Sequence, residues 1–301
     1  MSEYRDGTAL WRSIADRARA AARATGVPTN ELIRRVVYDR FLARVFADPT
    51  APWVLKGGTA ALARVNDARH SKDVDLLRAL GDIDQALAAL RTAVEIDVGD
   101  HFRFVIGAVR PVGGTAPQPD VSGYRVQIDA YCGVSHCESF SVDLVTGSVM
   151  TAQPETLVPR TPLEVPGLPR PTVRLYPVVD HIADKLCATE ATYAGVPSSR
   201  ARDLVDLVVF ARTQHVDGSA LHTAIAAERL HRGLPRRDTF TVPASWSRTY
   251  PPAAAKVPLC AEYPDTTSAT ALVAQLLEPA MTGAARQHGW DPATSTWSQV
   301  T

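Results

Sequence analysis

Few of the features that mark a secreted, membrane-bound or zinc-binding protein occur in this 301-residue chain. No apolar run approaches the ~20 residues that a membrane-spanning helix needs, and the first residues do not resemble a secretory signal. The four cysteines lack the paired spacing of a zinc site, so reduced thiols are expected; they are Cys132, Cys137, Cys187 and Cys260. These absences predict a cytoplasmic protein without membrane contact.

An excess of charge of one sign is also missing. The chain has 32 basic and 32 acidic residues and a formal net charge of zero. This balance excludes a uniformly basic nucleic-acid binder, although a local basic face stays open. Arginine far outnumbers lysine, which suits forked contacts with phosphate. The hydrophobic fraction of 46% is enough for one large core or two modest ones.

Helical periodicity is present at both ends of the chain. Residues 8–47 are expected to be helical, and the apolar side chains of residues 30–46 fall on one stripe. Charged side chains lie mostly opposite that stripe: Arg34, Arg35, Asp39, Arg40 and Arg44. A solvated face is the expected role of this set, and an RNA-facing surface is the alternative. The chain is again mainly helical after residue 177.

Alternating apolar residues in the middle of the chain predict a mixed α/β core. A helix is expected over residues 83–94, and strands over 101–106, 124–131 and 139–145. Residues 150–177 contain seven prolines and little periodicity, which favours a wrapping segment or a linker between lobes. The predicted fold is therefore α/β (α+β). Its expected domains are N-terminal helices plus a mixed-sheet core at 1–150, a linker at 151–177 and a helical C-terminal lobe at 178–301.

A diglycine turn provides the first sign of chemistry. The apolar residues 52–55 are expected to form a strand that leads into Lys56, Gly57, Gly58 and Thr59. Glycines allow the backbone to approach a ligand closely, and Thr59 is a plausible cap for the helix that follows. Because the free amides at a helix start attract phosphate, this turn is a candidate phosphate site.

A pair of carboxylates follows the turn after about fifteen residues. In a strand, Asp73 and Asp75 point to one face, while Val74 and Leu76 point to the other. Two neighbouring carboxylates repel each other unless a cation lies between them, and Mg²⁺ binds carboxylate and phosphate oxygens. Either motif alone is commonly a plain turn or a solvated strand end. Together they indicate a site for a nucleoside triphosphate and its metal.

The segment from Leu55 to Leu76 resembles the signature of the nucleotidyltransferase superfamily. Within that superfamily the chain is most similar to the AbiEii/AbiGii toxins, which include the mycobacterial MenT toxins. That branch also has a later lysine helix and an Arg-Asp-x-x-Asp helix, which match Lys185 and the segment from Arg202 to Asp206. The resemblance extends from about residue 30 to about residue 250. It implies that Asp73 and Asp75 bind Mg²⁺, or Mn²⁺, and that Lys185 contacts the triphosphate.

The same resemblance implies a third carboxylate on a neighbouring strand, which would bind a second metal ion and help to activate the attacking hydroxyl. Asp143 and Asp129 both occupy alternating strand segments. Asp143 is favoured because apolar residues flank it on both sides. A polar outer face on either strand is an equally good explanation.

The helix expected around Arg202–Arg212 is apolar on most sides, so Asp203 and Asp206 should be partly buried and in need of partners. Lys185, Arg200, Arg202 or a bound nucleotide could provide them. The pattern does not decide which of the two carboxylates touches a ligand.

Two further sets of residues have alternative roles. Ser71 is expected on the same strand face as Asp73. The family resemblance makes it a candidate nucleotide contact and a site that a kinase-like antitoxin could phosphorylate. The alternative is a small residue that only packs beside the acidic pair.

A cluster of basic residues in the C-terminal half could bind RNA together with Trp246 and Tyr250: Arg229, His231, Arg232, Arg236 and Arg237. Core packing is the commoner role of such aromatic residues.

Taken together, the motifs and the resemblance predict a toxin of a toxin–antitoxin system. The resemblance alone implies the acceptor: nucleotides from an NTP, with CTP or UTP as the candidates, would be added to the 3′ end of tRNA and so block its charging. One alternative is a transferase acting on a protein or small molecule, such as an antibiotic adenylyltransferase. The other is a binding module that has lost its activity.

Overall fold

The computed structural model describes residues 4–112, 123–161, 163–193 and 195–299. The N-terminal part contains α1 (Gly7–Thr25), α2 (Thr29–Val45), β1 (Trp53–Lys56), α3 (Gly57–Arg64), β2 (Asp73–Arg78), α4 (Ile83–Val94), β3 (Phe102–Val112), β4 (Gly123–Cys132), β5 (Ser135–Val145), β6 (Glu155–Leu157) and β7 (Val173–Leu175). The C-terminal part contains α5 (Val178–Glu190), β8 (Thr192–Tyr193), β9 (Val196–Pro197), α6 (Ala201–Thr213), β10 (Val216–Asp217), α7 (Gly218–His231), α8 (Trp246–Ala254), the 3₁₀ helix η1 (Pro258–Cys260), α9 (Thr266–Thr282), β11 (His288–Asp291) and β12 (Thr296–Gln299).

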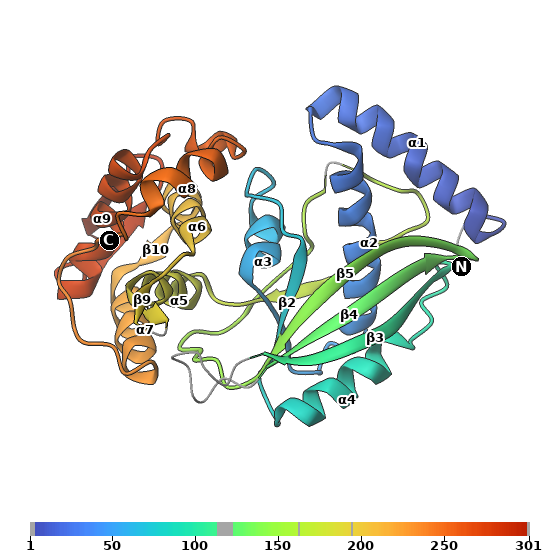
Figure 1. The fold of residues 1–301 in the computed structure, drawn as a ribbon, viewed down its shortest axis with the longest axis horizontal. Helices are drawn as coiled ribbons and strands as arrows, with labels where there is room; N and C mark the ends of the chain where they lie inside the picture. Colours follow the sequence, from blue (N-terminus) through green and yellow to red (C-terminus); the bar gives the residue numbers. More distant parts are fainter. Residues whose placement is uncertain (1–3, 113–122, 162, 194, 300–301) are drawn as a thin grey trace.

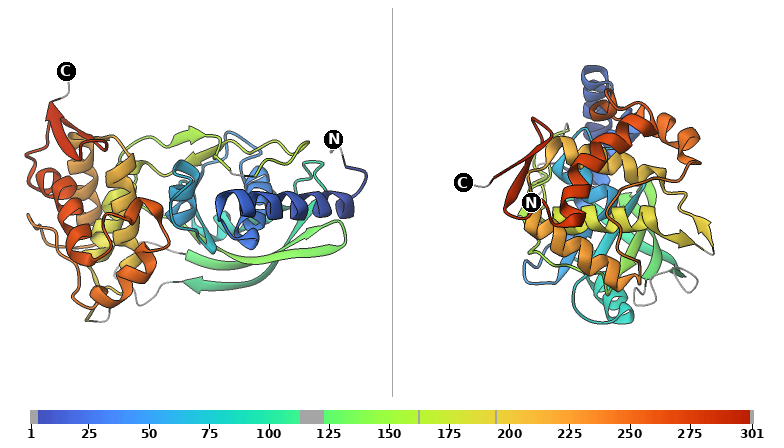
Figure 2. Two further views of the ribbon diagram at one scale, coloured as in Figure 1. Left: turned by 90° about the horizontal axis from the view of Figure 1, so that it is seen from above. Right: turned by 90° about the vertical axis from the view of Figure 1, so that its left-hand side faces the viewer.

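The molecule is elongated, with its sheet and its C-terminal helices at opposite ends (Figures 1 and 2). Helices α1, α2 and α4 accompany the sheet at one end, α5 to α9 gather at the other, and α3 lies between them. Two separate sets of buried apolar residues follow the same division: one joins the sheet to α1, α2 and α4, and the other fills the C-terminal helices. Helix α3 contributes Ala60 to the first set and Ala61 to the second.

The central sheet has seven strands in the order β3-β4-β5-β2-β1-β7-β6. The pairs β2–β5 and β1–β7 are parallel, and the other neighbours are antiparallel. The α/β prediction is confirmed by this mixed sheet. The three strands predicted in residues 101–145 correspond to β3, β4 and β5, and the predicted helix at 83–94 corresponds to α4.

Helix α2 covers one face of the sheet through aromatic contacts. The ring of Phe41 packs edge-on against Phe104 of β3 and Phe140 of β5, and Tyr38 also contacts Phe140. Since side chains alternate along a strand, the residues between these buried positions face the other side of the sheet. Asp73, Asp75 and Asp143 all lie on that second face.

The N-terminal helical stretch is divided into α1 and α2. Gly26 adopts φ +74° at the C-terminal end of α1, and its amide donates to the Ala22 carbonyl. Pro28 then precedes the first turn of α2. A left-handed glycine and a following proline are the usual signals of a helix end and a new start.

The solvated face predicted for α2 is wrong at two positions. Arg40 and Arg44 are buried, with relative exposures of 3% and 1%. Arg44 donates two hydrogen bonds to Asp100 and a third to the Phe102 carbonyl, and Arg40 donates to the Pro169 carbonyl. The prediction failed because Asp100 and the later proline-rich segment, both distant in sequence, cover this side of the helix.

The proline-rich segment at 151–177 contributes to the sheet instead of only connecting two lobes. Strand β7 pairs with β1 through Leu175 and Leu55, and β6 pairs with β7 at the sheet edge. No helix in the described part of the chain is both long and apolar enough to cross a membrane.

Candidate active site

The diglycine turn lies where β1 passes directly into α3. Lys56 is the last residue of β1, and α3 begins at Gly57, whose φ is +59°. Thr59 was predicted to cap this helix, and that prediction is wrong. Thr59 is the third residue of α3, and its hydroxyl donates to the Asp73 carbonyl at 2.8 Å. Because no described side chain caps α3, its first amides are not occupied by a capping group.

The acidic pair lies directly across from this turn. Asp75 of β2 is the strand partner of Lys56, and a Cβ atom on Gly57 would lie 1.9 Å from an Asp75 carboxylate oxygen. Asp73 is on the same face of β2, one pleat away. The Asp75 carboxylate therefore lies at the amino end of α3, and Asp73 shares its face of the strand.

Strand pairing distinguishes the two candidates for a third carboxylate. Asp143 of β5 is directly opposite Asp75, and Ser141 is opposite Asp73. Asp129 of β4 is instead opposite Ser139, which precedes Asp143 by four residues on β5. The Ser139 hydroxyl donates a hydrogen bond to the Asp129 carboxylate. The structure thus brings Asp143, and not Asp129, beside the acidic pair.

Like charges at these positions make the site electrostatically strained. Burial, and then the neighbouring charge of Asp143, raise the pKa of Asp75 to about 6. Arg125 of β4 offsets part of this charge through two hydrogen bonds of 2.7 Å to the Asp143 carboxylate. Among the described residues, no three His, Cys, Asp or Glu side chains are close enough to hold a metal ion without other ligands.

The pKa of Asp75 predicts how pH affects the metal-free protein. The folded pKa of about 6 exceeds the ordinary value of 3.8, so the folded chain holds a proton that the unfolded chain has lost between these pH values. Stability therefore falls as pH rises from about 4 to about 6. Compared with Asp75→Asn, the wild type should lose up to about 3 kcal/mol over this range. Urea unfolding in EDTA at several pH values measures the difference, and parallel curves would contradict the prediction.

Gly57 predicts a sharp steric test. Gly57→Ala places a side chain at φ +59° and pushes a Cβ into Asp75. Gly26→Ala is a matched control, since Gly26 has φ +74° but nothing within 4 Å of the added atom. Both variants should lose about 1 kcal/mol of stability from the left-handed backbone. Only Gly57→Ala should also lose most of its nucleotide transfer. Equal activities in the two variants would show that the contact with Asp75 is unimportant.

Two other predicted nucleotide-binding residues lie near the turn. The Lys56 ammonium donates to the Ser148 hydroxyl at 2.9 Å and lies 4.2 Å from the centre of the Tyr176 ring. The Ser71 hydroxyl donates to the Asp73 carbonyl at 2.9 Å. Ser71 is partly buried and precedes β2 by two residues.

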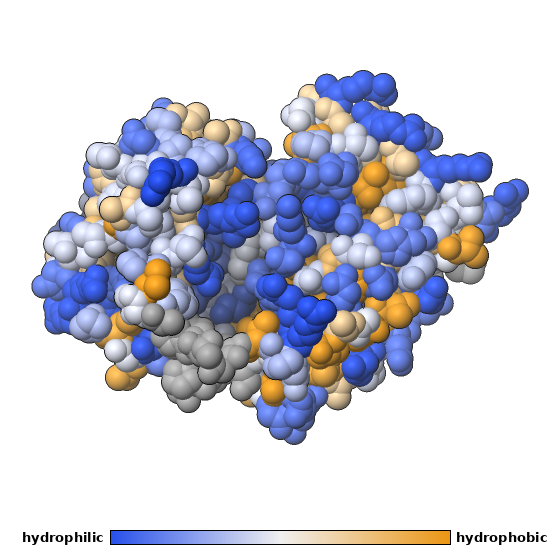
Figure 3. Space-filling view, viewed as in Figure 1, coloured by the Kyte–Doolittle hydropathy of each residue, from blue (hydrophilic) through white to orange (hydrophobic). Residues whose placement is uncertain are grey.

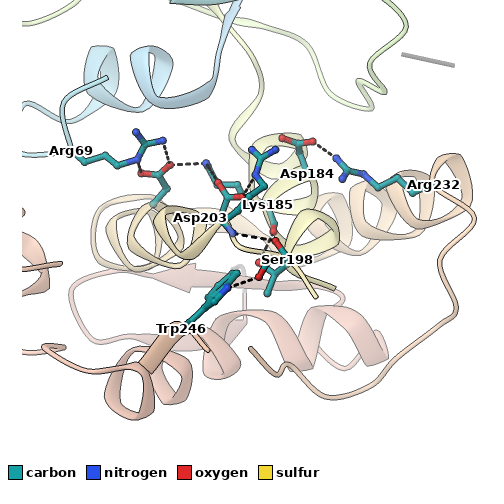
Figure 4. A network of polar contacts seen from close by, with 10 residues as sticks. Arg69, Asp184, Lys185, Ser198, Asp203, Arg232 and Trp246 are labelled. Carbon is teal, nitrogen blue, oxygen red and sulfur yellow. Dashed lines mark hydrogen bonds and ion pairs between the residues drawn. The ribbon is translucent and has the colours of Figure 1, made fainter. Parts of the chain in front are cut away.

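The residues predicted in the C-terminal lobe form one buried charge network (Figure 4). The Lys185 ammonium of α5 donates to Asp203 at 3.0 Å and to Asp206 at 2.6 Å, both on α6. Arg200 completes the network by donating to Asp203 at 2.7 Å. Burial would raise the pKa of Asp206, but Lys185 and Arg69 together hold it below its usual value. Both carboxylates are thus paired with cations.

Arg69 is the residue that the sequence reasoning left without a role. It lies between α3 and β2, and its guanidinium donates two hydrogen bonds to Asp206, at 2.9 and 3.0 Å. A Cβ atom on Gly58 would lie 3.0 Å from both of its terminal nitrogens. Arg69 therefore connects the diglycine turn to the Lys185 network. Its place in the segment between the diglycine turn and the acidic pair could have marked it as a site residue. Its partner could not be found from the sequence, because Asp206 lies 137 residues later.

Much of the proposed arginine and aromatic cluster is structural. Trp246 and Tyr250 are buried and donate hydrogen bonds to the Ser198 and Tyr263 carbonyls, so their use as RNA-stacking residues is contradicted. Arg229 is buried and paired with Glu190, and Arg232 with Glu228 and Asp184. Burial would raise the pKa of Asp184, but Lys56, Arg232 and Arg200 hold it well below its usual range. Arg236 and Arg237 are exposed.

The candidate site lies apart from two cavities of the structure. Cavities of about 510 and 360 Å³ lie beside α2 and the segment 163–172, and no predicted site residue lines either of them. Figure 3 shows that the surface is hollowed between the C-terminal helices and α2, and that the residues there are mainly hydrophilic.

The fold and this site together define a nucleotidyltransferase: carboxylates on a mixed sheet face the amino end of a helix, with buried cations behind it. The chain belongs to the AbiEii family, because the family model described as "Nucleotidyl transferase AbiEii toxin, Type IV TA system" matches residues 40–286. The predicted enzyme class and family are thereby confirmed.

Two crystal structures from Helicobacter pylori also match. One is described as a "putative nucleotidyltransferase" and is 19% identical in sequence to this chain. The match covers 81% of this chain and 93% of that chain, with a TM-score of 0.45. The other, of JHP933, is 18% identical, with coverage of 81% and 90% and a TM-score of 0.43. No curated protein matches this chain.

Proposed function

We propose that this protein adds nucleotides from an NTP to the 3′ end of tRNA, in a Mg²⁺-dependent reaction that blocks aminoacylation and so stops translation. CTP and UTP are the proposed donors, and the cytoplasm is the proposed compartment. The observation that carries the proposal is the position of the Asp75 carboxylate at the uncapped start of α3, where it fills the space that a Cβ atom on Gly57 would need. Membership of the AbiEii toxin family supports it.

The reaction is a displacement at the α-phosphorus of the NTP. The terminal RNA hydroxyl forms the new oxygen–phosphorus bond, and the bond to the β-phosphate breaks, releasing pyrophosphate. Asp143, which lies directly opposite Asp75, would help to take up the hydroxyl proton. Mg²⁺ or Mn²⁺ bound at Asp73, Asp75 and Asp143 would neutralise charge on the phosphates.

The phosphates would lie between the turn and the cations of the C-terminal lobe. The amides of Gly57 and Gly58 would hold phosphate oxygens at the positive end of α3. Lys56 and Lys185 would offset the negative charge that develops on the leaving pyrophosphate. In this proposal Asp203 and Asp206 hold the Lys185 ammonium in place and do not bind the metal.

The toxin family implies an antitoxin partner. We propose that the antitoxin acts on Ser71, as a kinase. A phosphate there would add nearly two negative charges beside Asp73 and repel the incoming triphosphate. Ser71→Ala should then make the enzyme insensitive to its antitoxin while leaving transfer intact.

Incubation with each labelled NTP, Mg²⁺ and total RNA tests the proposed function. Label should enter tRNA from CTP, from UTP or from both, and only when the 3′ hydroxyl of the tRNA is free. Label that enters protein or a small molecule would instead identify a transferase with another acceptor. No transfer to any acceptor, together with unchanged toxicity of Asp73→Ala, would identify an inactive binding module.

A further inference from the structure

The face of the sheet opposite α2 and α4 is polar over three long strands. Strands β3, β4 and β5 alternate between buried residues toward the helices and partly or fully exposed residues on the other side. Besides the acidic residues already described, the outward positions include Arg103, Arg110, Gln127, Tyr131, His136, Ser139 and Ser141. A sheet that exposes one face to solvent is common, but this one bears arginines and rings on the strands that carry the active site.

We propose that this face binds the single-stranded 3′ end of the RNA acceptor and guides it to Asp143 and Asp75. The inference rests on the proposed function, because it concerns the same reaction. Single-stranded RNA is recognised when its bases stack on aromatic or arginine planes and its backbone meets positive charge.

A cluster of three side chains supplies the stacking surface. The Arg103 guanidinium lies 4.5 Å from the centre of the Tyr131 ring, and the His136 ring packs edge-on against Tyr131 at 5.3 Å. Arg103 and His136 are exposed and Tyr131 is partly exposed. The cluster contributes nothing to the buried core, since the core residues of these strands point the other way. A base can therefore contact it without unfolding any element.

Three arginines lie among the carboxylates of this face, where they can meet the phosphates of an RNA chain. Arg103, Arg110 and Arg125 lie on this side of the sheet. Arg125 is half-exposed and bound to Asp143. Asp129 is held by the Ser139 hydroxyl at 2.5 Å, and His136 donates or accepts at that same hydroxyl at 2.9 Å. An acidic oxygen at this position can accept hydrogen bonds from the amino groups of bases.

The stacking cluster and the acidic residues are joined by continuous strands. His136 and Asp143 are both on β5, and seven residues of strand span roughly 20 Å. Gln127 and Ser141 are strand partners along the way. An RNA end that stacks at Tyr131 can thus extend along β5 and present its last hydroxyl at Asp143. The exposed arginines of α1 lack this continuity, because α1 packs with α2 against the other face.

Binding of a fluorescent 12-nucleotide single-stranded RNA, measured by anisotropy, tests this surface. Tyr131→Ala should weaken binding roughly 5- to 100-fold, the effect expected for one lost stacked base. Tyr131→Phe should bind like the wild type because it keeps the ring. Arg103→Ala should weaken binding and lower its salt dependence. Arg91→Ala is the matched control, since Arg91 is exposed on α4 at the opposite face and should have no effect.

Two outcomes would overturn the inference: wild-type protein that does not bind the RNA, or Tyr131→Ala and Arg103→Ala variants that bind and label it normally. Melting temperatures and the NTP-dependent thermal shift should be unchanged in these variants, which separates RNA binding from folding and from the nucleotide site. Failure of the proposed function is distinct, because the wild type would then label no RNA at all.

Discussion

Replacing Asp73 with asparagine is expected to lower nucleotide transfer by about three orders of magnitude, while the melting temperature stays the same. A carboxylate that holds a catalytic cation contributes several kcal/mol to the transition state, and each 1.36 kcal/mol is a factor of about ten. The fold should not suffer, because Thr59 and Ser71 donate their hydrogen bonds to the Asp73 carbonyl and not to its side chain. Expression of the variant should also leave bacterial growth unaffected.

Asp84→Asn provides the control for this experiment. Asp84 is exposed on α4 at the opposite face of the sheet, so the same chemical change there should leave transfer intact. Rates are measured with labelled NTP and total RNA at saturating Mg²⁺. If Asp73→Asn transfers nucleotides at the wild-type rate, the carboxylates of the reaction lie elsewhere, and the assignment of the β2 face is wrong.

The acidic face itself could be predicted from sequence because its cause is local. Side chains alternate along any strand, so Asp73 and Asp75 had to share a face once β2 was recognised. The same period identified β3, β4 and β5. The choice between Asp143 and Asp129 needed the register of β5 against β2, which depends on which strands become neighbours. Flanking apolar residues favoured Asp143, but only the pairing places it beside Asp75.

The predictions from the sequence failed where segments that are far apart in the chain pack together. Helical spacing places Arg44 on the polar side of α2, yet it is buried in an ion pair with Asp100, which lies 56 residues later. Thr59 has the chemistry of a cap, but Asp73 provides a closer acceptor. Arg69 could not be assigned because its function depends on Asp206, on a helix in the other lobe. Helical and strand periods carry no information about such partners.

Replacing Lys185 with methionine is expected to lower the free energy of unfolding by about 3 kcal/mol and to remove most NTP binding. Lys185 is 3% exposed and contacts two buried carboxylates. Removing one partner of a buried ion pair leaves a charge without full compensation, which costs several kcal/mol. Arg69 and Arg200 still pair with Asp206 and Asp203, which keeps the loss toward the lower end of that range.

The loss of NTP binding follows from the charge count of the network. Arg69, Lys185 and Arg200 pair with Asp203 and Asp206, so three cations meet two carboxylates. Arg69 connects this network to Gly58 at the start of α3. A triphosphate is the anion that this excess suits. Wild-type protein should be stabilised by about 2.7 kcal/mol when the free NTP is 100 times its Kd. Lys185→Met should lack most of this shift, because Lys185 is the buried cation that contacts both carboxylates and whose charge also acts on Asp75 at the turn.

Arg200→Gln separates the structural role from the binding role. Arg200 also binds Asp203, but its side chain is 54% exposed, so its loss should cost at most about 1 kcal/mol. NTP should still stabilise this variant. Urea unfolding with and without NTP compares the three proteins at one pH. If Lys185→Met is destabilised but retains the full NTP shift, Lys185 serves only to neutralise Asp203 and Asp206, and the triphosphate must be held by Lys56 and the amides of α3.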